Sequence, residues 1–444
     1  MNQAIQGMPK SGLNHLQKKI LFTLGFLAIY RIGVHIPIPG VDTEALSQFF
    51  AGQGANLLSM FNMFSGGALE RFSVFALGVM PYISASIISQ LLTVVVPQLE
   101  ALSKEGEAGR KKITQYTRYG TILLAVIQGF MIANTLEGSD FGGSQLVMDG
   151  GPGWKAMTVL SLTAGTAFVM WLGEQMTERG VGNGISLIIF AGIVAGLPTV
   201  IGNTYSQYNS QQMDLFRILL LVAICIVIVA GVVFIETGAR QVPVQYAKRQ
   251  VGRMVYGGQQ SHLPIRVNAS GVIPPIFASS LLQFPVTIAA VSPESRMADF
   301  VNTFMGPGGW LYNLIYVVFI IFFAFFYTKI VFKTDEIAEN LKKNGGFIPG
   351  IRPGVRTAEH LDKIVDRLTL AGSIYLAAIC VLPTVLAGEF GVQFYFGGTS
   401  LLIVVGVALE TFRQIEAHRQ SLKYDAFMKQ GSSAAAGKRR IPIR

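Results

Sequence analysis

Residues 57–72 read LLSMFNMFSGGALERF, and residues 73–96 continue as SVFALGVMPYISASIISQLLTVVV. The first stretch is apolar, but a Gly-Gly pair breaks it, and it is shorter than the roughly 20 apolar residues that a helix needs to cross a bilayer. The second stretch is uncharged and long enough to cross, yet it contains Pro81, several serines and Gln90. This pair predicts an apolar segment that does not span a membrane, next to a span that does not face lipid alone.

The composition indicates the class of protein. Charged residues make up 14% of the 444 residues, against roughly 25% in soluble domains, and 51% are hydrophobic, which predicts a polytopic membrane protein. Cys225 and Cys380 lie in different apolar runs and favour buried free thiols over a disulfide. The five histidines lack ligand spacing, so we expect no metal site. The first 19 residues lack the pattern of a removable signal peptide.

Ten stretches are apolar and long enough to cross a membrane as helices, so the predicted fold class is an all-α polytopic membrane protein. The stretches are 20–38, 73–96, 119–136, 156–173, 184–203, 218–235, 269–290, 310–332, 368–387 and 392–409. The first is the weakest because it contains Arg31 and His35. The last two are separated by a few residues around Glu389, which predicts a tight helical hairpin.

The distribution of charge predicts the orientation. With the N-terminus placed inside, the inner segments are 1–19, 97–118, 174–183, 236–268, 329–367 and 410–444. They contain 30 of the 35 Lys and Arg residues but only 15 of the 25 acidic residues. This asymmetry follows the positive-inside rule and predicts that both termini are cytoplasmic.

Ten spans divide into two sets of five, and because five is odd the second set enters the membrane from the opposite side. Such inverted halves place a pathway at their interface. No sequence repeat relates the halves, so an unrelated ten-helix bundle is the alternative. The predicted parts are an N-terminal segment 1–19, a first half 20–203, an outer connection 204–217, a second half 218–412 and a cytoplasmic tail 413–444.

Spans two, five, seven and ten contain or follow prolines, glycines and polar amides, which lipid-exposed helices seldom carry. We therefore expect these four spans to line a wet pathway, whereas span six is apolar on all faces and is expected to face lipid. Aliphatic side chains recur at helical spacing in spans two and five and occur singly in seven and ten. Plain packing is one explanation for them. If they converge, they form a constriction that blocks ions by dewetting.

Two inner loops are long and basic. In 236–268, alternating runs around Val242–Tyr246 and Leu263–Val267 flank a glycine-bearing turn and predict an extended hairpin. In 333–367, the charged helix DEIAENLKKN precedes a proline- and glycine-rich tip that presents Arg352. Such loops either fix topology beside anionic phospholipids or dock a large negatively charged partner such as ribosomal RNA.

No motif for energy coupling or cofactor binding is present, so we expect neither an enzyme nor a cofactor. EGEAGRKK at 105–112 lacks the spacing of a phosphate-binding loop. Glu174, Glu236 and Glu410 lie at inner ends of spans, and no acid lies mid-membrane, where proton-coupled carriers need one. This argues against the alternative function, a secondary solute transporter with inverted repeats; a structural scaffold is a third possibility. Arg31 lies within the first predicted span, near its outer end. The simplest explanation of this charge is that the long side chain reaches out to the membrane surface.

Several strings together resemble one family. MFNMFSGGALERFSVFALGVMPYISASI, EGEAGRKKITQYTRYGT, WLGEQMTERGVGNGIS, NLKKNGGFIPGIRPG and FYFGGTSLLIVV are similar, in this order, to the SecY family of protein-translocation channels. The likeness covers about residues 15–425. It weakens in the outer loops 137–155, 204–217 and 291–309 and in the tail GSSAAAGKRRIPIR.

The resemblance implies two inverted five-helix halves, hinged between spans five and six, around a central hourglass pore with a re-entrant plug helix at about 57–69. It implies a channel of the bacterial inner membrane that passes unfolded secretory polypeptides across the bilayer. A lateral gate between spans two and three on one side and seven and eight on the other would release apolar segments into lipid. The implied partners are SecE and SecG, the SecA motor, the ribosome, secretory and membrane-protein precursors, and anionic phospholipids.

The resemblance also assigns residues of this sequence to four sites. The pore ring is Val79, Ile83, Ile189, Ile276 and Ile403, with Ile185 beside them. The plug residues are Phe61, Asn62, Met63, Phe64, Ser65, Gly66 and Gly67. The lateral-gate residues are Ser84, Ile87, Gln90, Phe277 and Ser280. The partner-docking residues are Lys248, Arg249, Arg253, Arg352 and Tyr424.

Overall fold

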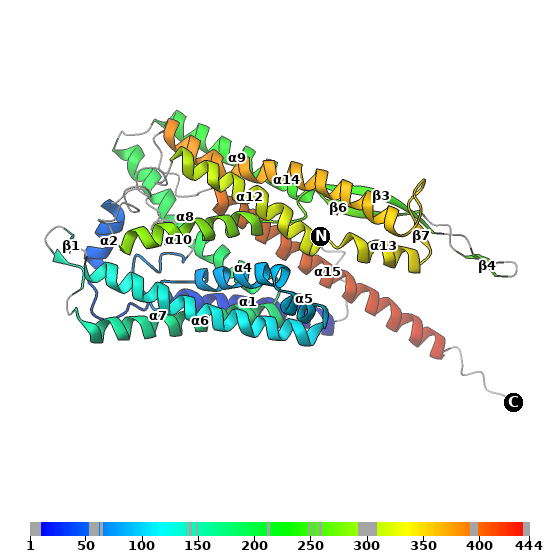
Figure 1. Ribbon diagram of the computed structural model, residues 1–444, viewed down its shortest axis with the longest axis horizontal. Coiled ribbons are helices and arrows are strands. Elements are labelled where there is room, and N and C mark those ends of the chain that lie inside the picture. The colour runs from blue at the N-terminus through cyan, green and yellow to red at the C-terminus, as the bar shows by residue number, and fades with distance from the viewer. Residues whose placement is uncertain are drawn as a thin grey trace. The chain divides into compact units, whose positions relative to one another are not determined.

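The computed structural model describes most of the chain (Figure 1). The described residues are 10–52, 62, 65–138, 140–141, 144–147, 150–210, 214–246, 249–251, 254–256, 260–291, 309–390 and 398–437. The chain forms two compact units, each of which is described by itself. Unit 1 is residues 1–53, 58–197 and 407–444, and unit 2 is residues 54–57 and 198–406.

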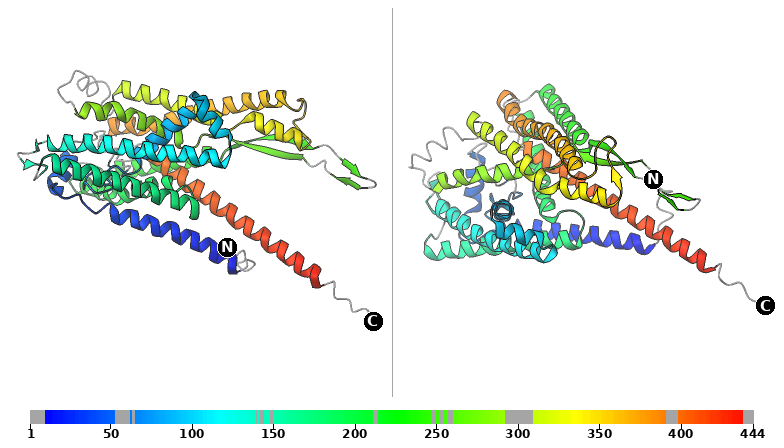
Figure 2. Two further views of the ribbon diagram at one scale, coloured as in Figure 1. Left: turned by 60° about the horizontal axis from the view of Figure 1, so that its bottom comes forward. Right: turned by 45° about the vertical axis from the view of Figure 1, so that its right-hand side comes forward.

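Unit 1 is built from helices and one short hairpin. Its helices are α1 (Lys10–Gly33), α2 (Thr43–Gly52), α4 (Met80–Val95), α5 (Pro97–Lys104), α6 (Glu107–Glu137), α7 (Pro152–Arg179) and most of α8 (Gly184–Asn209). Strands β1 (Asp140–Phe141) and β2 (Ser144–Gln145) pair antiparallel. The C-terminal part of α15 (Gly398–Gly437), from Val407 onward, also belongs to this unit, and Figure 2 shows α15 as one continuous helix.

Unit 2 combines helices with a small sheet. Its helices are α9 (Leu215–Thr237), α10 (Ile273–Val291), α12 (Trp310–Val331), α13 (Thr334–Lys343), α14 (Val355–Phe390) and the start of α15. The strands are β3 (Ala239–Tyr246), β4 (Arg249–Val251), β5 (Met254–Tyr256), β6 (Gln260–Arg266) and β7 (Gly346–Phe347). The sheet order β6-β3-β7 is antiparallel throughout, and β4 pairs with β5 at the far end of the hairpin (Figure 1).

The mostly helical, membrane-spanning prediction is confirmed. Each of the ten predicted stretches overlaps a described helix. By length and composition, six helices of the described chain can cross a membrane, namely α6, α7, α8, α9, α12 with α13, and α14. Helices α4 and α5, bent by 98° at their break, make a seventh if they count as one span. Only 6% of the apolar window of α9 is buried, as expected for a lipid-facing helix. The count of ten spans stays a prediction.

Two predicted span starts are wrong. Helix α4 begins at Met80 and not at residue 73, because residues 73–79 form turns, and Ser73 pairs with Pro37 in an isolated bridge. Gly78 adopts φ +53°, which ends the turn segment, and a proline in the first turn then starts the helix. Helix α10 likewise begins at Ile273, after Gly271 at φ +64°.

Three helices are longer than the predicted spans. Helix α6 begins at Glu107, α14 begins at Val355, and α15 runs to Gly437. Apolarity reports the part of a helix that lies in hydrocarbon, whereas polar residues continue the same helix into water. The apolar pattern therefore predicted where helices lie but not where they end.

The turn segment before α4 packs against α7 in unit 1. Phe72 and Leu77 are at most 1% exposed and share a core with Leu162 of α7. A Cβ at Gly165 of α7 would collide with the carbonyl oxygen of Val74. The backbones of α7 and of residues 73–79 therefore touch, and only glycine fits at this crossing.

We predict that Gly165→Ala destabilises the protein by about 1–3 kcal/mol, because the added methyl group meets backbone that cannot move aside. Thermal unfolding in detergent, followed by tryptophan fluorescence, measures the effect. Gly153→Ala is the matched control, since a Cβ at Gly153 meets nothing within 4 Å. Equal melting temperatures for the two variants would contradict the prediction.

Candidate functional site

The predicted plug segment is described at Asn62 and from Ser65 onward; Phe61, Met63 and Phe64 lie outside the described residues. Asn62 closes a loop with Glu70: its Nδ2 donates to Glu70 Oε2 over 3.0 Å, and the Glu70 amide donates to Asn62 Oδ1 over 2.9 Å. The Gly67 amide donates to the Asn62 carbonyl over 2.8 Å. Asn62 is therefore hydrogen-bonded to Gly67 and Glu70 in a segment that is not a spanning helix.

Helix α1 also holds this segment. Tyr30 donates its hydroxyl to the Ser65 carbonyl over 2.9 Å, and Arg31 Nη1 donates to the Gly66 carbonyl over 3.0 Å. The interpretation of Arg31 as a snorkelling side chain is therefore incomplete, because its guanidinium has a protein acceptor. The sequence shows a charge within a span but gives no sign of which carbonyl it binds.

The predicted pore-ring residues lie on four helices. In unit 1, Val79 is the N-cap of α4 and accepts the amide of Ile83 over 3.0 Å, so the two side chains lie one turn apart. Ile185 and Ile189 lie one turn apart on α8. In unit 2, Ile276 lies on α10 and Ile403 on α15. All except Ile185 are at most 7% exposed.

Ile185 differs from the other ring residues in its surroundings. It is half-buried, and a Cβ at Gly173 of α7 would lie 2.9 Å from Ile185 Cδ1. At least the tip of this side chain therefore packs on α7. The convergence of ring residues from the two units stays a prediction.

The predicted lateral-gate residues include two buried polar groups. On α4, Gln90 Nε2 donates to Ser86 Oγ over 3.3 Å, whereas Gln90 Oε1 is buried and has no partner within the described chain. On α10, Ser280 is 2% exposed, and its Oγ likewise has no partner there. Buried polar atoms are normally paired, so each marks a place where the fold leaves a hydrogen bond unmade.

The other gate residues are apolar or small. Ser84 and Ile87 on α4 are both 4% exposed. Phe277 on α10 packs edge-to-face against Phe323 of α12, with ring centroids 5.8 Å apart, and against Tyr327, 6.4 Å away. Helices α10 and α12 are therefore joined by aromatic contacts within unit 2.

The predicted extended hairpin is confirmed. Strands β3 and β6 pair with Val242 opposite Leu263, and the buried faces of Val242 and Ile265 contact Leu361 of α14. The predicted charged helix is α13, whose Thr334 hydroxyl donates to Asp362 of α14 over 2.7 Å. The hairpin, α13 and the inner part of α14 therefore share one hydrophobic core.

A polar network ties the base of this hairpin to the start of α10. Asn268 Nδ2 donates to Glu236 Oε2 at the end of α9 over 2.9 Å and to the Gly271 carbonyl over 3.0 Å. The Val267 amide donates to the Gly238 carbonyl over 3.1 Å. Asn268 is 4% exposed and Glu236 is 9% exposed, so this junction is buried and well paired.

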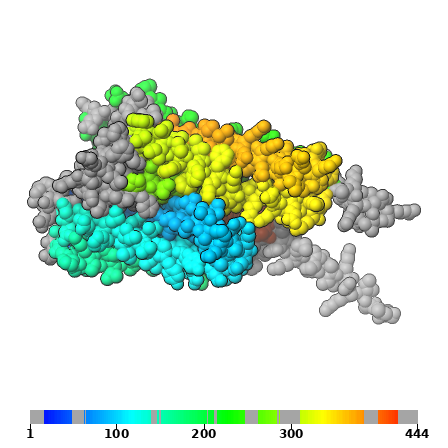
Figure 3. All heavy atoms as spheres, in the orientation of Figure 1, coloured from blue at the N-terminus to red at the C-terminus, as the bar shows by residue number. Residues whose placement is uncertain are grey.

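The predicted docking residues are described unevenly. Arg352 is exposed between β7 and α14. Arg249 lies on β4 opposite Tyr256, and Tyr424 lies on α15; their side chains are outside the described atoms, as are Lys248 and Arg253 entirely. Figure 3 shows α13 and the adjoining part of α14 at the surface of unit 2. On α13 a hydrogen bond from Lys343 lowers the pKa of the exposed Glu339 carboxyl.

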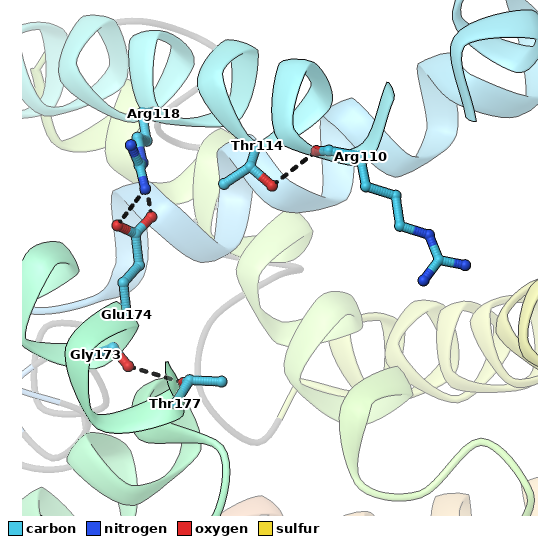
Figure 4. Close-up of polar contacts among 6 residues, drawn as sticks. All are labelled: Arg110, Thr114, Arg118, Gly173, Glu174 and Thr177. Carbon is cyan, nitrogen blue, oxygen red and sulfur yellow. Dashed lines mark hydrogen bonds and ion pairs between the residues drawn. The ribbon is translucent and has the colours of Figure 1, made fainter. Parts of the chain in front are cut away.

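An ion pair that the sequence did not predict joins α6 to α7 (Figure 4). Arg118 Nε and Nη2 donate to the two carboxylate oxygens of Glu174 over 2.9 and 2.8 Å. The Glu174 side chain is 16% exposed and the Arg118 side chain 43%. Two opposite charges at inner span ends were the available signal, but their separation of 56 residues gave no reason to pair them. No group of three or more His, Cys, Asp or Glu suited to a metal occurs among the described residues.

Comparison with known proteins identifies the family. The SecY family model matches residues 73–412. Over 434 residues the chain is 51% identical to protein translocase subunit SecY of Escherichia coli K12, and the match covers 97% of each chain. The chain belongs to the SecY family. A SecY of Vibrio cholerae is 48% identical over 435 residues, again with 97% of each chain covered.

Solved structures support the fold of this SecY-family chain. A protein-conducting channel superposes with a TM-score of 0.64 at 15% identity, covering 92% of this chain and 93% of the other. A SecY structure in which the plug domain was studied gives a TM-score of 0.63 at 17% identity, with the same coverage. Canine Sec61 in a ribosome–channel complex gives 0.62 at 16% identity, also with 92% and 93% covered.

We predict that Arg118→Met lowers stability by about 1–3 kcal/mol, because it leaves the largely buried Glu174 carboxylate without its ion pair; the half-exposed arginine reduces the penalty of a fully buried pair. Thermal unfolding of the purified protein measures this. Lys104→Met is the matched control: it breaks an exposed pair with Glu100, which we expect to contribute little to stability because solvent screens it. Adding Glu174→Leu to Arg118→Met should recover part of the loss. Equal effects of Arg118→Met and Lys104→Met would show that the buried pair is not a structural link.

Proposed function

We propose that this SecY-family chain forms a protein-conducting channel in the bacterial inner membrane, with both termini in the cytoplasm. The observation that carries the proposal is 51% identity, over 97% of the chain, to a protein translocase subunit. The channel passes unfolded secretory polypeptides across the bilayer and releases apolar segments sideways into lipid. The comparisons give no support to the alternative of a solute transporter. We propose that the chain performs no catalysis itself.

The proposed architecture is ten spans in two inverted five-helix halves around an hourglass pore. The aliphatic residues on α4, α8, α10 and α15 form its ring. Their chemistry supports this role: a ring of hydrocarbon side chains excludes water and ions when closed, yet forms no strong bond with a passing chain. The burial of Ile83 and Ile276, at 5% and 7% exposure, is consistent with a closed waist.

The proposed lateral gate lies between α4 with α6 and α10 with α12. Support comes from the two polar groups on α4 and α10 that lack partners, Gln90 Oε1 and Ser280 Oγ. Each unmade hydrogen bond is costly in an apolar surrounding. A seam that opens exposes them to water or to a polypeptide backbone.

The proposed cytoplasmic docking surface consists of the β3–β6 hairpin, the exposed Arg352 and the tail with Tyr424. Clustered Lys and Arg give salt-dependent affinity for an anionic partner, so this surface serves the SecA motor or the ribosome. Ribosome-bound relatives such as the canine channel share the fold. SecE and SecG are the proposed membrane partners, and anionic phospholipids contact the basic inner loops.

Photo-crosslinking tests the proposed function directly. We expect a photoreactive residue in place of Ile83 to form an adduct with a stalled secretory precursor, because the ring encircles the translocating chain. The same residue at Ile226, which is 63% exposed on α9, is the control and should react with lipid instead. Absence of a precursor adduct at 83, or equal adducts at both positions, would contradict a pore at the ring.

We also predict that replacing Ile83 and Ile276 with glycine makes the idle channel leak ions, since each change removes a whole hydrocarbon side chain from the dewetted ring. Deleting residues 57–69 should do the same by removing the plug. Single-channel conductance of the purified complex in planar bilayers measures the leak. Ile226→Gly controls for placing glycine in a lipid-facing helix. A closed-state conductance like that of the parent would count against both assignments.

A further inference from the structure

Hydrogen bonds hold together the described residues on either side of residues 63–64. These residues, Asn62 and Ser65–Glu70, are here called the plug root. The reciprocal bonds of Asn62 and Glu70, at 3.0 and 2.9 Å, close it as a loop. Within that loop the Ser65 hydroxyl also donates to the Asn62 carbonyl over 3.1 Å. The plug root is therefore a self-bonded turn of defined shape.

Two consecutive side chains of α1 hold two consecutive carbonyls of the plug root. Tyr30, which is fully buried, donates to Ser65, and Arg31 donates to Gly66. Both residues lie in the last turn of α1, which ends at Gly33. A cation there also interacts favourably with the negative end of the helix dipole.

The plug root also contacts α8. Gly66 adopts φ +69°, and a Cβ on it would lie 2.8 Å from the Gly192 Cα. Two glycines therefore let two backbones meet, and the Gly66 carbonyl is turned to the guanidinium of Arg31. Since this backbone is not part of a regular helix, the arginine supplies a hydrogen bond that no helix turn provides.

We propose that Tyr30 and Arg31 are positioning residues that fix the plug root on α1 and thereby set how tightly the idle channel is sealed. This rests on the proposed function, in which residues about 57–69 are the plug. Removing either donor leaves a carbonyl of the root without that partner and favours states in which the root leaves its seat between α1 and α8.

The test is the closed-state ion conductance of the purified complex in planar bilayers, for Tyr30→Phe, Arg31→Met and the double variant. We expect the double variant to raise the fraction of conducting idle channels about tenfold, which corresponds to ~1.4 kcal/mol. Arg31→Lys should restore much of the seal to the single Arg31 variant, because an ammonium can still donate to the Gly66 carbonyl. Lys155→Met is the matched control: Lys155 donates to Asn134 over 3.0 Å and pairs with Glu137, and neither partner belongs to the plug root.

A double-mutant comparison separates positioning from general damage. In a channel lacking residues 57–69, adding Arg31→Met should change nothing further, because the carbonyl that it holds is gone. A further rise in that background, or a conductance increase by Lys155→Met of the same size, would overturn the proposal. If the deletion leaks but Tyr30→Phe with Arg31→Met does not, the anchor is wrong while the channel function stands. If the deletion itself does not leak, the plug assignment fails and the anchor with it.

Discussion

The constraint on which the structure depends is the need to satisfy backbone hydrogen bonds where water is absent. Helices satisfy their backbone hydrogen bonds internally, which explains why a helix overlaps each predicted apolar stretch. Residues 65–79 meet this need differently, with bonds among Asn62, Gly67 and Glu70 and donors from α1. Non-helical backbone is tolerated there because protein surrounds it. The described part of the apolar segment 57–72, Asn62 and Ser65–Phe72, is therefore held without forming a spanning helix.

The same constraint explains how a channel of this kind can sort polypeptides without reading their sequence. Each Leu, Ile, Phe or Val favours the membrane centre by about 0.3–0.6 kcal/mol, whereas Lys, Arg or Asp costs about 2.5–3.5. Twenty apolar residues thus favour lipid by roughly 6–12 kcal/mol, and two or three central charges largely cancel this. Where a seam opens toward lipid, this partitioning determines whether a segment enters the lipid or continues across the membrane. An aliphatic ring suits the task because it binds no class of side chain strongly.

The sequence predicts what depends on local pattern. Alternation predicts the hairpin in which Val242 faces Leu263, and apolar length predicts the spans. Prediction from sequence fails where a side chain contacts a partner that is distant in the chain. The acceptor of Arg31 is a backbone carbonyl, which no residue type announces, and the partner of Arg118 lies 56 residues away among several acids at inner span ends. Helix ends were missed as well, because polar residues extend helices such as α6 beyond the bilayer.

Buried polar groups in the described part of this protein are of two kinds, those that are hydrogen-bonded and those that are not. Closed networks, such as Asn268 with Glu236 or Asn62 with Glu70, pair their donors and acceptors and therefore stabilise one arrangement. Open groups, such as Gln90 Oε1 and Ser280 Oγ, leave a bond unmade and destabilise the arrangement that buries them. A channel needs both. Paired networks stabilise the parts that must not move, whereas each unpaired group disfavours the arrangement that buries it.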